Sequence, residues 1–203
     1  MNIRNTKFWR LLRFIRRFIR HNVINAAFFT VYKSEIPYPE STKIKDRFPI
    51  SFRLGSMDDI IELTKDEHTY DRAAKKRAAE SLKRGDDIFI GSLEGKVVLY
   101  GWVAYKQMDL GFKDFSNLPA GTAYVYKVHT TKQFRRRGYF SKFFKFIHSY
   151  LGKKGYQAVL TVVNNNNLPS IKAHLKLGFK PFGRIISITF LGIHYNHYKV
   201  NTI

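Results

Sequence analysis

The 203-residue sequence contains no cysteine. Disulfides, thiolate metal sites and a covalent cysteine acyl-enzyme are therefore excluded. We expect no metal site of any other kind. A chain without cysteine suits a reducing compartment, and we expect a cytoplasmic protein.

Acidic residues are also scarce. Lys and Arg number 36 against 15 Asp and Glu, a formal net charge of +21 at pH 7, and Phe115–Ile203 contains no acidic residue. This charge favours polyanionic partners such as an anionic membrane, nucleic acid, acyl carrier protein or phosphorylated small molecules. Any chemistry in the C-terminal half must use groups other than its own carboxylates. With 44% hydrophobic residues the chain can bury a core, so it is not a disordered protein.

A long uninterrupted apolar run is missing as well, so we expect no membrane-spanning helix. Residues 1–32 contain a pattern typical of a basic amphipathic helix, strongest over Ile3–Ala27. Its apolar stripe consists of Phe8, Leu11, Leu12, Ile15, Phe18, Ile19 and Val23, and its other face of Arg10, Arg13, Arg16, Arg17 and Arg20. We interpret it as a helix on an anionic membrane surface, which would place the protein at the cytoplasmic face. Packing against its own domain, a mitochondrial targeting role and nucleic-acid binding are the alternatives.

Pro37 and Pro39 then interrupt the chain, and residues 33–48 are predicted to form a linker. Residues 49–203 predict one α/β domain. Strands are expected at Ile50–Leu54, Ile88–Leu93, Lys96–Tyr105, Ala123–Thr130 and Ala158–Val163, with one or two more in Arg184–Val200. Helices are expected from the N-cap Ser56 to about Lys65 and at Arg72–Lys83, Gly138–Lys153 and Ser170–Lys176. This order predicts a mixed sheet with helices on both faces.

A strand, a short basic loop and a helix start follow one another in Tyr124–Ser141. The loop carries Arg135, Arg136 and Arg137, and Gly138 opens the helix. Unpaired N–H groups and the positive dipole end at a helix start attract phosphate, and glycine lets the backbone approach closely. The segment therefore predicts a cradle for a pyrophosphate. A nucleic-acid contact or a solvated basic loop could have the same sequence.

A second segment, Asn167–Phe179, follows a predicted strand and contains Gly178, a residue suited to a helix C-cap. Together the two segments resemble the GNAT superfamily (Gcn5-related N-acetyltransferases). Its R/Q-x-x-G-x-G/A acyl-CoA loop is matched by Arg135, Gly138 and Phe140, and its N-x-x-[A/S]-x-x-x-Y-x-x-x-G-F segment by Asn167, Ser170, His174, Gly178 and Phe179. The resemblance covers about Ile50–Val200. It implies a mostly antiparallel central sheet flanked by helices, with acetyl-CoA or a related acyl-CoA as the donor.

The resemblance also implies that the strands Tyr124–Thr130 and Ala158–Val163 splay and bind pantetheine through their main chains. The residues that it places at the cofactor are Val128, Thr130, Arg135, Arg136, Arg137, Gly138, Tyr139, Phe140, Asn167 and Ser170. Phe140 replaces a small residue of the family's loop, which implies a looser or differently shaped contact. His174 stands where the family usually has a tyrosine that protonates the departing thiolate. A histidine can donate that proton near neutrality, and a polar helix residue without a catalytic role is the alternative.

The family's mechanism implies a base, often a glutamate, that deprotonates the attacking amine. Because no carboxylate follows Asp114, His129 on the central strand is our first candidate. A histidine that faces the other side of the sheet is the alternative. The connection between the first two helices offers further candidates for base or acceptor site, unless it is a solvated connector; they are Asp66, Glu67, His68 and Asp71.

We therefore expect an acyl-CoA-dependent N-acetyltransferase that transfers acetyl directly to an amine, without a covalent intermediate. The basic N-terminal pattern suggests a small or lipid-linked acceptor, for example an amino sugar or an envelope precursor. Long-chain acyl carrier protein is an alternative donor, since that acidic protein suits a basic surface. A non-catalytic nucleic-acid or membrane-binding protein is the alternative of another class. Steep salt dependence of nucleic-acid binding without thioester turnover would indicate it.

Overall fold

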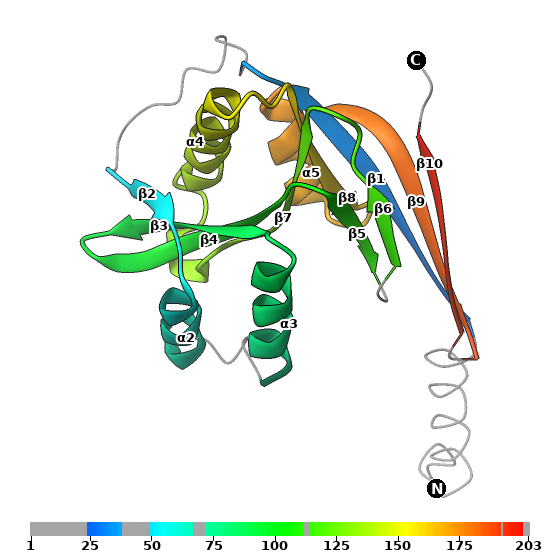
Figure 1. Ribbon diagram of the computed structural model, residues 1–203, viewed down its shortest axis with the longest axis horizontal. Coiled ribbons are helices and arrows are strands. Elements are labelled where there is room, and N and C mark those ends of the chain that lie inside the picture. The colour runs from blue at the N-terminus through cyan, green and yellow to red at the C-terminus, as the bar shows by residue number, and fades with distance from the viewer. Residues whose placement is uncertain (1–23, 38–48, 67–71, 112–113, 192, 201–203) are drawn as a thin grey trace, which may run out of the picture.

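The computed structural model describes residues 24–37, 49–66, 72–111, 114–191 and 193–200 (Figure 1). The strands are β1 (Ile24–Glu35), β2 (Ser51–Leu54), β3 (Asp87–Leu93), β4 (Lys96–Ala104), β5 (Gln107–Gly111), β6 (Asp114–Asn117), β7 (Thr122–Thr130), β8 (Ala158–Asn164), β9 (Lys180–Phe190) and β10 (Ile193–Val200). The helices are α2 (Met57–Asp66), α3 (Arg72–Lys83), α4 (Tyr139–Lys153) and α5 (Leu168–Lys176), and a 3₁₀ turn spans Lys132–Phe134. Within these residues no helix has the length and apolarity needed to cross a membrane.

Eight strands form one sheet in the order β10-β9-β1-β8-β7-β4-β3-β2, and β5 and β6 form a separate hairpin. Within the large sheet β7 and β8 run parallel, and the other neighbouring pairs are antiparallel. The predicted mixed, mostly antiparallel sheet is thereby confirmed. The predicted strands and helices of residues 49–203 are present, and β9 begins four residues earlier than expected, at Lys180 rather than Arg184.

Helices cover both faces of the sheet, as the element order predicts (Figure 1). On one face α4 contributes Phe143, Phe144 and Ile147, which are fully buried, to one core cluster. On the other face Ile60 of α2 and Ala78 of α3 belong to a second cluster. Burial of each large apolar side chain stabilises the fold by about 1.5–3 kcal/mol. Strand β7 lies between β8 and β4 inside the sheet and contributes residues to both core clusters, for example Val125 to the first and Tyr126 to the second.

The first described strand corrects the N-terminal prediction. β1 occupies Ile24–Glu35, where we expected the end of a helix within residues 1–32 and the start of a linker at 33–48. It pairs antiparallel with β8 on one side and with β9 on the other, so it belongs to the domain. These long-range pairings prevail over the local helical pattern, which is a weak determinant by itself. The predicted helix and linker otherwise lie outside the described residues, at 1–23 and 38–48.

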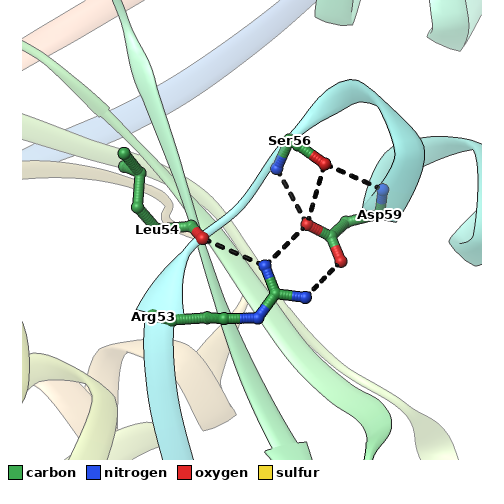
Figure 2. Close-up of polar contacts among 4 residues, drawn as sticks. All are labelled: Arg53, Leu54, Ser56 and Asp59. Carbon is green, nitrogen blue, oxygen red and sulfur yellow. Dashed lines mark hydrogen bonds and ion pairs between the residues drawn. The ribbon is translucent and has the colours of Figure 1, made fainter.

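The start of α2 is fixed by a polar network around Asp59 (Figure 2). Arg53 donates two hydrogen bonds to the Asp59 carboxylate, at 2.9 and 2.6 Å. The Ser56 backbone N–H donates to the same carboxylate at 2.8 Å, and the Asp59 N–H donates to the Ser56 hydroxyl at 3.5 Å. This reciprocal arrangement is a capping box, and it confirms Ser56 as the N-cap. It joins the edge strand β2 to the first helix.

We expect the Asp59→Asn variant to lower the free energy of unfolding by about 1–2 kcal/mol at pH 7, because a charged cap and ion pair are lost. The Arg53 hydrogen bonds hold the pKa of Asp59 below its usual 3.8. Its contribution is thus present above that value and disappears as the pH falls through the lower, folded-state pKa. Urea unfolding at pH 7 and pH 3 measures both effects. Asp58→Asn, an exposed neighbour in the same helical turn, is the control, and equal losses in both variants would contradict this account.

Candidate active site

A cavity of about 400 Å³ opens where β7 and β8 separate. The two parallel strands are paired only from Thr122↔Ala158 to Tyr124↔Leu160, and beyond this point no register joins them. The cavity lies in the resulting gap. Its lining comes from both strands and from the elements around them, namely Phe29, Asp109, Tyr124, Tyr126, Lys127, Val128, Phe140, Thr161, Val162, Val163, Asn164, Asn167, Ser170, His174 and Ile185. The splay between these strands is therefore observed, and five of the predicted site residues line it.

A bulge in β7 shapes the inner end of this gap. Tyr100 of β4 pairs with His129 and Trp102 with Tyr126, so two residues of β7, Lys127 and Val128, lie opposite one residue of β4. Lys127 adopts a left-handed conformation with φ 49°. Such a conformation is sparsely populated for a lysine and is a feature of functional sites. The bulge interrupts the β4–β7 ladder beside Val128, a residue that lines the cavity.

The basic loop leads from β7 to an open helix start. Arg135 donates through Nε to the Thr130 carbonyl oxygen at 2.9 Å, which holds the loop against the end of the strand. Arg136 and Gly138 have φ values of 63° and 81°. Gly138 is the N-cap of α4 and has no side chain to bond the first N–H groups of the helix. A Cβ placed on Gly138 would meet nothing within 4 Å. The predicted cradle therefore has open space and unshielded donors.

The side chains of the next three predicted site residues, Arg137, Tyr139 and Phe140, lie in different surroundings. The Arg137 guanidinium stacks over Phe134, 5.4 Å from the ring centroid. Tyr139 is buried in the core, so only its backbone is available to a ligand in the cradle. Both residues line a second groove, of about 1100 Å³, between α4, the 3₁₀ turn and the end of the β3–β4 hairpin. Phe140 points instead toward α5, with its ring 5.1 Å from that of His174. It thus closes one side of the β7–β8 cavity.

The start of α5 is satisfied internally, in contrast to α4. The Asn167 side chain accepts a hydrogen bond from the Ser170 N–H at 3.2 Å and caps the helix. His174, one turn further, donates through Nδ1 to the Ser170 carbonyl oxygen at 2.8 Å. The His174 ring is only 4% exposed and packs edge-on against Phe144 and Phe179. Its Nε2 is buried and has no hydrogen-bond partner among the described residues.

A second buried histidine shows why the open Nε2 of His174 matters. His148 on α4 donates through Nδ1 to the Phe144 carbonyl oxygen at 2.7 Å, the same backbone bond that His174 makes one turn back. Its Nε2, however, accepts from the Ser34 hydroxyl at 3.2 Å. A buried polar atom without a partner destabilises a protein by about 1–3 kcal/mol. His148 is a satisfied core residue, whereas His174 presents an unused acceptor beside the cavity.

Burial lowers the pKa of both His148 and His174 below 6.5. The unfolded chain therefore binds more protons than the folded one below about pH 6.5. Stability is complete above that pH and falls as the pH decreases toward the folded-state values. We expect stability to fall between pH 7 and pH 5 in urea unfolding, by at most about 2 kcal/mol per histidine, which is the linkage limit over this interval. The loss should shrink in a His148→Asn/His174→Asn variant. The same loss of stability should persist in His194→Asn, an exposed control. If only His194→Asn abolished the loss, its assignment to His148 and His174 would be contradicted.

The candidates predicted for the base lie in different places. His129 lies on β7 beyond the bulge, half-buried, and its ring stacks on Tyr100 at 5.4 Å. It is outside the lining of the β7–β8 cavity. The other candidates, in the connection between α2 and α3, lie outside the described residues at 67–71, and the Asp66 side chain is likewise not described.

Asp109 is the cavity residue that our sequence analysis missed. Among the described residues that line the cavity, it is the only carboxylate. It comes from the β5–β6 hairpin, a segment where we predicted no regular structure. Two stacked tyrosines, Tyr124 and Tyr126, lie beside it with ring centroids 5.2 Å apart. Burial, followed by the charge of Asp109, raises the pKa of Tyr124. The Lys127 ammonium lies in the same cavity, 5.4 Å from the Tyr126 ring centroid. This part of the cavity therefore accommodates a cation.

A hydrogen-bond network at its hydroxyl holds the Tyr126 ring in place. Its hydroxyl donates to Asp86 at 2.7 Å and lies 3.1 Å from the Ser81 hydroxyl. Arg84 in turn donates to Asp86 at 2.9 Å and to Ser81 at 3.0 Å. This network joins the end of α3 to β7 and fixes the position of Tyr126, one of the aromatic rings that line the cavity.

The acetyltransferase (GNAT) family model matches residues 57–179, which include both strands, the cradle and α5. The chain belongs to the GNAT acetyltransferase family. Enzymes of this family use acetyl-CoA, and the features above fit such a ligand: an open helix start for its pyrophosphate, splayed strands for its pantetheine arm, and a buried acceptor at His174. A search of curated proteins returns no match.

Solved structures share the GNAT fold at low sequence identity. An acetyltransferase of the GNAT family from Colwellia psychrerythraea has a TM-score of 0.57 at 14% identity, over 89% of this chain and 62% of its own. An acetyltransferase of the family from Novosphingobium aromaticivorans has a TM-score of 0.56 at 14% identity, over 81% and 64%. The aminoglycoside acetyltransferase AAC(6')-Iy, in complex with a CoA bisubstrate analogue, has a TM-score of 0.51 at 18% identity, over 65% and 91%. This chain spans less than two thirds of the first two relatives.

Proposed function

We propose that the protein transfers an acetyl group from acetyl-CoA to a primary amine in the cavity between β7 and β8. One observation carries this proposal. The lining of one cavity includes Phe140, in the first turn of α4, and Asp109 with Tyr124 and Tyr126. The open start of α4 suits an anionic cofactor, and a carboxylate beside aromatic rings suits a cationic acceptor. Both substrates would thus be held together in one ternary complex, which provides proximity without a covalent intermediate.

Acetyl-CoA supplies an acetyl group activated as a thioester. The chain would bind its pyrophosphate at the first N–H groups of α4, where Gly138 leaves room and the arginine loop adds positive charge. Main-chain groups of β7 beside the bulge, at Val128 and Thr130, would bind the pantetheine arm. The Thr130 carbonyl already accepts from Arg135, which holds this edge in a fixed position.

In the chemical step the amine nitrogen attacks the thioester carbonyl, the C–N bond forms and the C–S bond breaks. The amine must lose a proton, and we propose that Asp109 receives it, directly or through water. His129 lies one pair beyond the bulge, and its role as base remains a prediction. An ammonium group entering between Asp109 and the tyrosine rings would be attracted before it is deprotonated.

His174 is neutral at pH 7 while it is buried, so it has no imidazolium proton to donate. Its proton lies on Nδ1, bonded to Ser170, and burial lowers its pKa, so Nε2 offers a lone pair at neutral pH. Burial therefore disfavours the proton donation predicted from the sequence. We propose that Nε2 accepts a hydrogen bond from the bound cofactor and positions it. CoA thiolate is a good leaving group, so the step can proceed without a strong acid.

For the acceptor we propose a small polyamine or amino sugar, since Asp109 is the one carboxylate among the described lining residues and shares the cavity with aromatic rings. The relative AAC(6')-Iy is an aminoglycoside N-acetyltransferase and was solved with a CoA–acetylneamine bisubstrate analogue, which is consistent with an amine acceptor of this class. The predicted placement of residues 1–23 on an anionic membrane, at its cytoplasmic face, remains a proposal, as does a lipid-linked acceptor.

The experiment is a screen for release of free CoA thiol from acetyl-CoA with glucosamine, neamine, spermidine and a lysine peptide. We expect turnover with at least one amine, and none with N-acetylglucosamine, whose nitrogen is already acylated. Binding of acetyl-CoA without turnover of any amine would contradict the proposed acceptor class. Absence of acetyl-CoA binding would contradict the proposed function itself.

A further inference from the structure

The distal ends of β1, β9 and β10 form a ribbon that extends past the helices (Figure 1). Six of the ten exposed large hydrophobic residues of the described chain lie on this ribbon rather than being scattered. They are Phe28, Ile188, Phe190, Leu191, Ile193 and Tyr195. Single exposed apolar residues need no explanation, but a contiguous set marks an interaction surface.

The strand register places five of these residues on one face. In an antiparallel sheet paired residues project to the same side. Phe190 pairs with Ile193, Ile188 with Tyr195 and with Ala26, and Ile186 with Phe28 and with His197. We call seven of these residues the apolar ribbon face: Ala26, Phe28, Ile186, Ile188, Phe190, Ile193 and Tyr195. His197 lies at its margin.

The opposite face of the same ribbon is polar. Its rows contain Asn25, Thr189 and His194, then Ala27, Ser187 and Asn196. The Thr189 hydroxyl and the His194 ring are hydrogen-bonded at 2.7 Å. A sheet that packed its own core would have the apolar residues on the covered face. The apolar ribbon face is exposed instead, with Ile193 at 72%, and none of the described elements covers it.

Cations border the apolar ribbon face. The row after His197 pairs Arg184 with Thr30 on one side and with Lys199 on the other. Both basic side chains are exposed, and residues 115–203 contain no acid. At about 3.3 Å per residue along β9, the row of Arg184 lies roughly 20 Å from Phe190, at the end of the ribbon. A tilted ribbon would thus place its apolar rows among acyl chains and its cations at the level of lipid phosphates.

We propose that the apolar ribbon face binds an anionic lipid bilayer. A second copy of the chain would bring like charges together, at a net charge of +21 per chain. Residues 1–23 contain no acid either, so their packing here would add positive charge to a cationic margin. An anionic leaflet complements both the apolar rows and the basic row. The polar reverse face and the acetyl-transfer cavity, which includes Ile185 and Phe29, would then face away from the lipid.

The test is co-sedimentation of the full chain with vesicles of phosphatidylglycerol and phosphatidylcholine in equal parts, compared with pure phosphatidylcholine. We expect binding to the anionic vesicles and a loss of at least about tenfold in the Phe190→Ser/Leu191→Ser/Ile193→Ser variant. Arg184→Glu/Lys199→Glu, which leaves the apolar residues intact, should also lose binding. Leu54→Ser/Leu175→Ser removes two leucines of similar exposure, 51% and 49%, outside the ribbon and should bind like wild type.

Three results would overturn the proposal. The first is no binding of the wild type to anionic vesicles, and the second is unchanged binding of both ribbon variants. The third is a wild-type dimer in analytical ultracentrifugation that the triple serine variant converts to a monomer, which would assign the face to a second copy. Acetyl-CoA affinity, measured on every variant, separates these results from misfolding and from failure of the proposed enzymatic function.

Discussion

The Gly138→Asp variant is expected to bind acetyl-CoA about 100-fold more weakly than the wild type. Gly138 opens α4 with φ 81°, and its missing Cβ leaves open space at the first N–H groups of the helix. An aspartate there would fill that space, cap the donors itself and place a negative charge against the pyrophosphate. Losing one or two charge-assisted hydrogen bonds costs about 3 kcal/mol, which corresponds to roughly 100-fold in affinity.

Gly155→Asp is the matched control for this prediction. Gly155 follows the other end of α4 with φ 82°, and its added Cβ would also meet nothing within 4 Å. Both variants therefore introduce the same side chain, charge and backbone strain of about 1–2 kcal/mol. Calorimetric titration should show acetyl-CoA affinity lost in the first variant and kept in the second. Equal losses would mean that strain, not ligand contact, explains the effect.

Asp109→Asn is expected to lower kcat/KM for the acetylated amine by about 100-fold, the usual contribution of a positioned base. Asparagine keeps the shape of the side chain but cannot take a proton or attract an ammonium group. Because Asp109 belongs to the β5–β6 hairpin and the proposed pyrophosphate site to the start of α4, the KM for acetyl-CoA should change little. Steady-state kinetics with each substrate varied in turn separates the two constants.

The control for the acceptor end is Glu94→Gln, which neutralises an exposed carboxylate in the β3–β4 turn. It should behave like the wild type. If Asp109→Asn retained full kcat/KM while His129→Gln lost it, the base would be the histidine that the sequence first suggested. In that case the proton of the amine would pass to His129 on β7 rather than to Asp109 in the β5–β6 hairpin.

The sequence was sufficient to predict the central part of the fold because its motifs are local. The basic loop connects β7 to α4, and the Asn167–Phe179 segment begins at the N-cap of α5 and contains that helix, so Gly138, Asn167 and Ser170 each belong to a local helix start. Five predicted residues line the same cavity, although they come from β7, α4 and α5.

What the sequence could not show depends on long-range contacts. β1 begins at Ile24, within the segment predicted to be helical, and its pairing with β8 and β9, more than a hundred residues away, was not visible in the local pattern. Asp109 lies in a hairpin without a motif, and its position over the cavity follows from tertiary packing. The burial of His174, which changes its expected role, depends on rings contributed by α4 and by Phe179.

The most direct test of the central claim, that acetyl-CoA binds between β7 and β8, is amide hydrogen exchange with and without the cofactor. We expect slower exchange at 125–130 of β7 and at 135–141 from the loop into α4, with no change at the tip of β9 and β10. Slower exchange confined to the groove between α4 and the β3–β4 hairpin, or no change at either segment, would contradict the account.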